Sequence, residues 1–269
     1  MKQTATHSPD GIPAATVVIF RHARTKGPNE GRDATGAPEL LMVTRSRNLS
    51  FAGGAAVFPG GRVDPEDYEL AAGIDSPYAV DETAHRIAAI RETLEETGLG
   101  IGLTGSVDGT IAKRARAMLL DTKALAPVLR ALNLTIHLDA IHPFSRWFPK
   151  NEKLSRVFDT RFYLADLGTG AVDIAVDETE NTKLYWITAR QALDDADAGK
   201  LTIIYPTRRN LERLATYADF SHAAESCRTY GAKMITPFLE ERDGERWLSI
   251  RDDAGYPVTG ERLDQSIRG

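Results

Sequence analysis

The sequence has few of the residues that crosslink a chain, anchor it in a membrane or bind a polyanion. It holds one cysteine, Cys227, so a single chain can form no disulfide framework and no cysteine-rich zinc site. No apolar run approaches the roughly 18 residues of a membrane span, and the first residues lack the basic-then-apolar pattern of a signal peptide. The net charge of −5 argues against a basic surface for nucleic acid. We therefore expect a cytoplasmic protein that binds neither membranes nor nucleic acid.

The remaining composition is typical of a globular protein, with 42% hydrophobic and 26% charged residues. We expect a single domain over residues 1–269, with a core at about 12–215 and a C-terminal extension at about 216–269. Runs rich in β-branched and aromatic residues predict strands at 15–20, 40–44, 55–58, 156–165, 183–187 and 201–204. Amphipathic spacing predicts a helical pair between 110 and 133, and Asp243-Gly244 between apolar runs predicts a C-terminal hairpin.

An acidic helix is the most informative stretch of the chain. Ile87, Ile90 and Leu94 recur at helical spacing within residues 84–99 and predict one apolar face. Gly98 stands where a helix often ends on a left-handed residue. Three carboxylates fall within about a third of the helix circumference, on Glu92, Glu95 and Glu96.

These carboxylates destabilise an isolated helix. Glu92 and Glu96 are like charges at i, i+4, which costs a few tenths of a kcal/mol. Glu95 and Glu96 also lie at the negative end of the helix dipole, which costs about 0.3–1 kcal/mol. A bound cation would reverse the sign of both contributions, and hard divalent ions prefer carboxylate oxygens. The cluster therefore indicates either a cation site or, more simply, a solvated acidic face.

A glycine turn precedes the acidic helix. Residues 57–61 read Val-Phe-Pro-Gly-Gly, a strand end followed by a turn whose backbone can approach a ligand closely. Together with Arg-Glu-x-x-Glu-Glu-x-Gly-Leu at 91–99, this turn resembles the Nudix box. The resemblance covers roughly residues 15–215. It implies an α/β/α sandwich with a mixed β-sheet, to which this chain adds a helical insertion at about 104–136 and the hairpin extension.

The box is split in this chain. In the usual box a glycine is followed by five residues, a glutamate, seven residues and then the arginine. Here Gly61 plus five residues leads to Asp67, and 23 residues separate Asp67 from Arg91. Glu82 is the other candidate for the first acid, although eight residues separate it from Arg91. An inserted loop at about 68–83 resembles the subgroup related to the peroxisomal coenzyme A diphosphatases.

The resemblance implies a pyrophosphohydrolase that uses Mg²⁺ or Mn²⁺. Its metal ligands would be Glu92, Glu95, Glu96 and the backbone carbonyl of Gly60, and Arg91 would orient Glu92. The expected small-molecule substrates are, in order, coenzyme A or an acyl-coenzyme A, ADP-ribose or another nucleotide sugar, and nucleoside triphosphates. The alternative is a Nudix-fold domain that senses a nucleotide without cleaving it. Either protein could form a homodimer.

An acid beyond the box often adds a metal ligand or a base in this family. Glu180 is the first candidate for that role here and Glu178 the second, and a solvated acidic loop is the alternative. The attacking water would give its proton to Glu92 or to Glu180.

Residues before the box partly resemble the motif of coenzyme A-directed Nudix enzymes. Arg45, Phe58 and Gly61 keep recognisable places, whereas Ser50 stands where the motif has a second arginine. Arg45 and Arg47 are candidate phosphate ligands, with ordinary surface charge as the alternative.

Two further pairs are candidates for the cleft. Asp159 and Arg161 are expected to pair with each other or to line the cleft. His142 and Trp147 could stack on a base or a pantetheine arm, or could form a packed aromatic corner.

Overall fold

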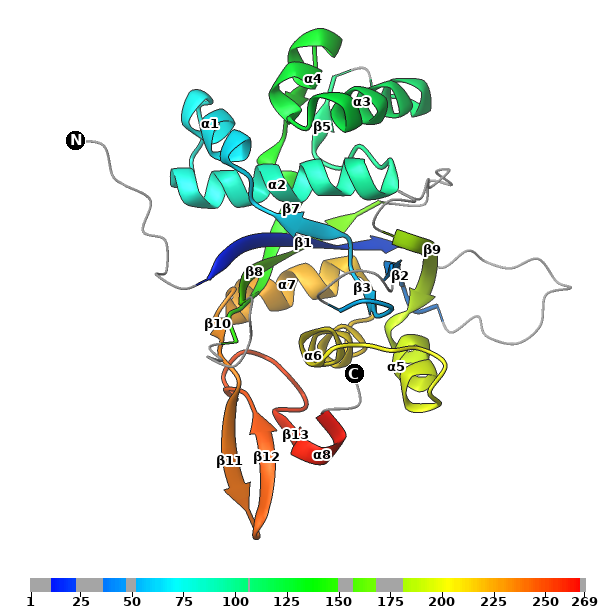
Figure 1. Cartoon of the computed structure of the whole chain (residues 1–269), viewed down its shortest axis with the longest axis vertical. Coiled ribbons are helices and arrows are strands. Elements are labelled where there is room, and N and C mark those ends of the chain that lie inside the picture. Colours follow the sequence, from blue (N-terminus) through cyan, green and yellow to red (C-terminus); the bar gives the residue numbers. More distant parts are fainter. Residues whose placement is uncertain are drawn as a thin grey trace, which may run out of the picture.

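The computed structural model describes residues 11–22, 36–46, 52–105, 107–149, 157–167 and 181–266. Within these ranges, a mixed β-sheet lies between two layers of helices (Figure 1). The sheet contains β1 (Ile12–Arg21), β2 (Glu39–Arg45), β3 (Ala56–Val57), β4 (Gly60–Arg62), β7 (Ile141–Trp147), β8 (Phe158–Asp166), β9 (Asn181–Thr188) and β10 (Met234–Ile235). This is the sandwich that the sequence predicted.

The strand order is β10-β7-β8-β1-β2-β3, while β4 pairs with β1 and β9 pairs with β2. The central pair, β1 and β8, is parallel, whereas β1 runs antiparallel to both β2 and β4. The antiparallel pairing of β4 with β1 places Gly60 opposite Thr16. The glycine turn is therefore held against the centre of the sheet.

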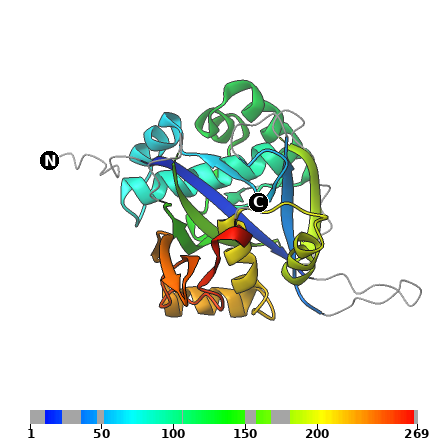
Figure 2. The same cartoon turned by 60° about the horizontal axis from the view of Figure 1, so that its bottom comes forward.

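Helices cover both faces of the sheet. One layer contains α1 (Pro65–Gly73), α2 (Val80–Thr97), α3 (Gly109–Thr122) and α4 (Leu125–Leu132), and the other contains α5 (Ala189–Asp197), α6 (Tyr205–Leu214) and α7 (Phe220–Tyr230). Alternate residues of β1 supply the two cores: Val17 and Ile19 pack with α2, whereas Val18 and Phe20 pack with α5–α7. Figure 2 shows the two helical layers on opposite sides of the sheet.

The acidic helix forms as predicted, although it begins at Val80 rather than near residue 84. Ile87, Ile90 and Leu94 are fully buried in the core. Gly98 ends the helix in the left-handed conformation with φ 75°, and its N–H donates to the carbonyl of Leu94.

The prediction of a loop at about 68–83 was wrong, because residues 65–73 form α1. The local sequence explains the helix: Pro65 occupies its first position, and the Asp67 carboxylate accepts a hydrogen bond from the N–H of Asp64. Tyr68 and Leu70 then pack against the α2 side of the core.

The helical pair predicted between 110 and 133 is confirmed as α3 and α4, which are flanked by the short strands β5 (Leu103–Thr104) and β6 (Thr135–Ile136). A short 3-10 helix (Leu138–Ala140) then leads into β7.

The predicted strand at 201–204 is absent, and these residues form an irregular segment before α6. Its backbone contacts β3 through one hydrogen bond, from the N–H of Ala56 to the carbonyl of Thr202.

The C-terminal hairpin is confirmed as β11 (Phe238–Arg242) and β12 (Glu245–Ser249), which form a small sheet with β13 (Gly260–Arg262); α8 (Leu263–Ser266) follows. Asp243 and Gly244 both adopt positive φ, as a type I′ turn requires. The small sheet lies against α6: Tyr205 donates from its hydroxyl to the carbonyl of Leu248.

The composition led us to expect no membrane-spanning segment and no disulfide framework or cysteine-rich zinc site. Among the described residues, the helices are too short or too polar to cross a bilayer. Cys227 is buried on α7, and burial raises the pKa of its thiol to about 11.

Candidate active site

A cavity of about 810 Å³ opens beside the glycine turn. Its acidic side chains come from α2 and from the segment between β4 and α1: Asp64, Glu92, Glu95 and Glu96. Its basic side chains are Arg45, Arg62, Arg91 and Lys123. Its apolar wall comes mainly from β7, β8 and the segments around them, including Trp147, Pro149, Phe158 and Phe162. The cavity lining therefore combines charged side chains of both signs with aromatic ones.

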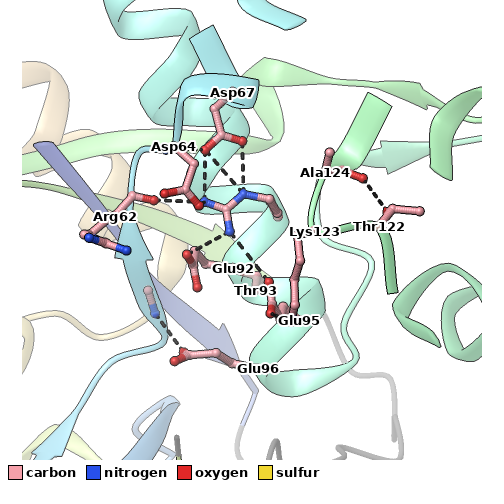
Figure 3. Close-up of polar contacts among 12 residues, drawn as sticks. Arg62, Asp64, Asp67, Glu92, Thr93, Glu95, Glu96, Thr122, Lys123 and Ala124 are labelled. Atoms are coloured by element: carbon pink, nitrogen blue, oxygen red, sulfur yellow. Dashed lines mark hydrogen bonds and ion pairs between the residues drawn. The ribbon is translucent and has the colours of Figure 1, made fainter. Parts of the chain in front are cut away.

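Arg91 is the centre of a buried ion-pair network. Its partners Asp64, Asp67, Glu92 and Glu95 are labelled in Figure 3. Its guanidinium donates to both carboxylate oxygens of Asp67 at 2.9–3.3 Å, to Glu92 Oε1 at 2.9 Å and to the carbonyl of Arg62 at 2.9 Å. Burial opposes the charge of Arg91, but Glu92 and Asp67 outweigh it and raise the pKa of Arg91 above its usual range. The guanidinium is fixed, and it fixes Glu92 in turn.

The structure distinguishes the two candidates for the first acid of the split box. Asp67 contacts Arg91 and is 1% exposed. Glu82 instead accepts from Arg86 at 2.8 Å and from Arg161 at 2.7 Å, and it does not line the cavity. The 23 residues between Asp67 and Arg91 fold as α1 and the start of α2, which brings the two side chains back together.

The two glycines of the turn are required by close approach. A Cβ on Gly61 would lie 2.3 Å from Glu92 Oε1, and a Cβ on Gly60 would lie 2.3 Å from the carbonyl oxygen of Ala15. The N–H of Gly60 donates to Glu96 Oε2 at 2.9 Å. The turn and the acidic helix therefore touch at two carboxylates.

Glu92, Glu95 and Glu96 line one cavity, but their carboxylates are each bound to other groups of the protein. Glu95 Oε1 lies 3.3 Å from Lys123 Nζ, and Glu95 Oε2 lies 3.6 Å from Arg91 Nη1. Over the described parts of the chain, no three acidic, imidazole or thiol groups converge closely enough to hold an ion as they stand. Burial raises the pKa of Glu92 to about 8, the charges of Glu96 and Glu95 act in the same direction, and Arg91 opposes them.

Of the predicted substrate residues, Arg45, Phe58 and Gly61 line the cavity. Arg45 ends β2, and its Nε is buried and has no hydrogen-bond partner among the residues that the structure describes. Phe58 is buried in the core that β1 shares with α5–α7. Arg47, Ser50, Glu178 and Glu180 lie outside the described residues.

The expectation that Asp159 and Arg161 pair with each other was wrong. Asp159 pairs with Arg146, whereas Arg161 pairs with Asp81 and Glu82. Neither lines the cavity, because the alternation of β8 directs Phe158, Thr160 and Phe162 to it instead.

His142 and Trp147 do not share a site. Trp147 lines the cavity and packs edge-on against Tyr205 and Tyr256, which is the packed aromatic corner of the two alternatives. His142 contacts Phe220 on α7.

Sequence reasoning missed two side chains that reach the cavity from distant segments, Lys123 and Thr207. Lys123 follows α3 in the left-handed conformation, with φ 55°, and Arg116 of α3 donates to the carbonyl of Glu95 at 2.8 Å. The helical insertion packs on the end of α2, and this packing brings Lys123 to the acidic side chains of the cavity. No local pattern marks either residue, because each is brought there by tertiary packing.

Known proteins resemble this chain in sequence and in structure. A scan of family models finds no match. The putative nudix hydrolase 7 of Caenorhabditis elegans is 29% identical over 234 residues, which cover 85% of this chain and 73% of that protein. The acyl-coenzyme A diphosphatase NUDT19 of Xenopus laevis is 24% identical over 241 residues, which cover 71% of this chain and 63% of that protein, so less than two thirds of the relative is matched.

Among solved structures, a NUDIX hydrolase from Alicyclobacillus acidocaldarius superposes with a TM-score of 0.68 at 26% identity. The superposition covers 81% of this chain and 97% of that one. The fold, the sequence similarity and the contact that Asp67 makes with Arg91 across the split box agree with one another. Sequence and fold therefore support the Nudix hydrolase superfamily for this chain, in a subgroup similar to the coenzyme A diphosphatases, and with it the assignment as a Nudix pyrophosphohydrolase.

Proposed function

We propose that the chain hydrolyses the diphosphate linkage of a nucleoside diphosphate derivative with Mg²⁺ or Mn²⁺, and that its preferred substrate is coenzyme A or an acyl-coenzyme A. One observation carries the proposal: a single stretch of α2 supplies three glutamates to a cavity that aromatic side chains also line. The name of the NUDT19 relative supports the choice of substrate. ADP-ribose or another nucleotide sugar ranks second, and nucleoside triphosphates third.

The residues present fit a hard divalent cation. Glu92, Glu95, Glu96 and the Gly60 carbonyl offer only oxygen donors, as Mg²⁺ and Mn²⁺ prefer. Burial contributes most to the raised pKa of Glu92, and the negative charges of Glu96 and Glu95 add to it; a cation would relieve that repulsion. When bound, the ion neutralises charge on the diphosphate and acidifies a water molecule.

The chain's own residues would orient the substrate and move a proton. Arg91, fixed by Asp67, holds the Glu92 carboxylate toward the cavity. Glu92 lines the cavity and is one candidate acceptor for the proton of an attacking water. Glu180 remains the other.

Two parts of the cavity would recognise the remainder of the substrate. The unpartnered Nε of Arg45 is a donor suited to a phosphate oxygen. Phe158, Phe162 and Trp147 offer an apolar surface for a base or for the uncharged part of the substrate.

Metal affinity should depend on pH in a predictable direction. At pH 7 the metal-free protein holds Glu92 largely protonated, because its pKa is raised to about 8. A cation binds the deprotonated form, so binding should release about one proton and strengthen about tenfold per pH unit below pH 8. Calorimetric titration of Mn²⁺ in two buffers of different ionisation enthalpy measures this release. It should disappear in Glu92→Gln, and an unchanged release in that variant would contradict the assignment.

Lys123 should assist substrate binding more than turnover. Its side chain is 68% exposed and pairs with Glu95 in the absence of metal. When Glu95 binds a cation instead, the lysine is free to contact substrate phosphate. Lys123→Ala should therefore raise KM about fivefold, with kcat within about twofold, since exposed ion pairs contribute about 1 kcal/mol or less. The control is Lys113→Ala, which changes an exposed lysine on α3, the helix that Lys123 follows; an equal change in both variants would contradict a specific role.

A panel of diphosphates assayed with Mg²⁺ or Mn²⁺ tests the proposed function, with products identified by mass spectrometry. Release of 3′,5′-ADP from coenzyme A is the expected result. Cleavage of ADP-ribose alone would select the second substrate class. Binding of the panel without any turnover would overturn the proposal in favour of a nucleotide sensor.

A further inference from the structure

The C-terminal extension reaches the cavity through the side chain of Tyr256. This residue lies between β12 and β13 and is 5% exposed, and its hydroxyl accepts a hydrogen bond from Trp147 Nε1 at 3.0 Å. Trp147 ends β7 and lines the cavity. The two residues are 109 positions apart in the sequence. Only the packing of the extension on the rest of the chain brings them together.

Asn210 closes a triangle of hydrogen bonds around the indole N–H. The Tyr256 hydroxyl donates to Asn210 Oδ1 at 2.7 Å, and Trp147 Nε1 also lies 3.3 Å from that oxygen. A hydroxyl has one proton and two lone pairs, so Tyr256 can donate to Asn210 while it accepts from the indole. Asn210 lies on α6 and is fully buried. Acceptors on two separate elements therefore hold one edge of the Trp147 ring.

The segment that carries Tyr256 is itself fixed. Ile250 is buried in the core that β1 shares with α5–α7, and its N–H donates to the carbonyl of Thr259 at 2.7 Å. A Cβ on Gly255 would lie 2.8 Å from the ring of Tyr230, so the chain passes closely along α7 just before Tyr256. The extension is therefore packed into the core and can hold a side chain in place.

Position decides what Trp147 offers to a ligand. The residue is only 1% exposed, so a small part of its ring reaches the cavity. Tyr205 and Tyr256 pack edge-on against that ring, with centroids at 6.1 and 5.9 Å. Rotation of the indole would break its hydrogen bond and leave a buried N–H without a good acceptor, which is unfavourable. Side chains of a binding site are held precisely when neighbouring hydrogen bonds restrict them in this way.

We infer that Tyr256 is a positioning residue, which fixes the Trp147 indole in the cavity wall and so sets the affinity for the uncharged part of the substrate. This inference rests on the proposed function for the identity of the substrate. Neither Tyr256 nor Asn210 lines the cavity, so the extension acts through Trp147 and on binding, not on the chemical step.

Tyr256→Phe tests the inference, because it removes only the hydroxyl. We expect KM for coenzyme A to rise about fivefold while kcat stays within about twofold. The matched control is Tyr217→Phe: this buried hydroxyl accepts from Arg213 Nε at 2.8 Å and lies outside the cavity lining. Both variants should lose thermal stability, but the control should keep its KM. An equal rise of KM in both variants would overturn the inference.

A double variant distinguishes positioning of Trp147 from a general structural effect. Trp147→Phe has no N–H for Tyr256 to accept from, and it should raise KM by itself. Adding Tyr256→Phe to it should change KM by less than about twofold further. If Tyr256→Phe raised KM by the same factor with and without Trp147, its effect would not pass through the indole and the inference would fail.

A binding measurement separates this inference from the proposed reaction. Calorimetry without metal should give dissociation constants of coenzyme A and ADP-ribose for the wild-type protein, the two single variants and the double variant. The non-additive pattern expected for KM should recur in these constants. If it recurs without cleavage of either compound, the role of Tyr256 is supported and only the proposed hydrolysis is rejected. Additive changes, or no binding of either compound to the wild-type protein, would overturn the role of Tyr256.

Discussion

Glu96→Gln should lower metal-dependent kcat by about 100-fold or more. Glu96 is 3% exposed, and its Oε2 is held by the Gly60 N–H at 2.9 Å, so it lies where the turn and the acidic helix meet. Glutamine keeps the size but removes the charge that a divalent ion requires, and loss of even a supporting group of a metal site costs 10–100-fold. Steady-state kinetics over a range of Mg²⁺ concentrations would measure the loss.

The matched control is Glu69→Gln, an exposed glutamate on α1 outside the cavity lining. It should leave both kcat and the Mg²⁺ dependence unchanged. Turnover by Glu96→Gln at the wild-type rate and metal concentration would show that Glu96 is not a ligand, and the assignment of α2 as the metal-binding helix would fail with it.

Asp67→Ala should destabilise the fold by about 3–5 kcal/mol, because it leaves the guanidinium of Arg91 buried without its main carboxylate partner. For a chain of this size the expected fall in Tm is roughly 10 °C. Thermal and urea denaturation followed by circular dichroism would measure both quantities. Activity should also fall, since Arg91 positions Glu92.

A double variant distinguishes the stability lost with the Asp67–Arg91 ion pair from the stability lost with side-chain packing. Asp67→Leu combined with Arg91→Met removes both charges, so it should be more stable than either single variant. Glu69→Ala, on the same helix but exposed, should change stability by less than about 0.5 kcal/mol. If Asp67→Ala were as mild as this control, the buried pair would contribute nothing to the fold.

Local patterns in the sequence predicted those helices, strands and turns whose formation depends on residues close to one another in the chain. The spacing of Ile87, Ile90 and Leu94 predicted the buried face of α2, and Gly98 predicted its end. The β-branched runs predicted β1 and β2, and Asp243-Gly244 predicted the hairpin turn. The same reasoning failed at 68–83, where loop signals were given more weight than the Asp64-Pro65 helix start.

Ion-pair partners could not be predicted in this way. Counting along the chain left Asp67 and Glu82 as candidates for the first acid of the split box and did not predict which of them contacts Arg91. Only the return of α1 against α2 brings Asp67 to the guanidinium, while Glu82 meets Arg86 and Arg161. Asp159 and Arg161 likewise find partners on other elements.

By itself the sequence determined that a glycine turn precedes a helix with three acids on one side, because spacing along a strand or helix follows from backbone geometry. The tertiary structure alone decided what surrounds them. It brought Asp67 to the guanidinium of Arg91, and it brought Lys123 and the start of α6 to the lining of the cavity. Such contacts join segments far apart in the chain, and they depend on how whole elements pack.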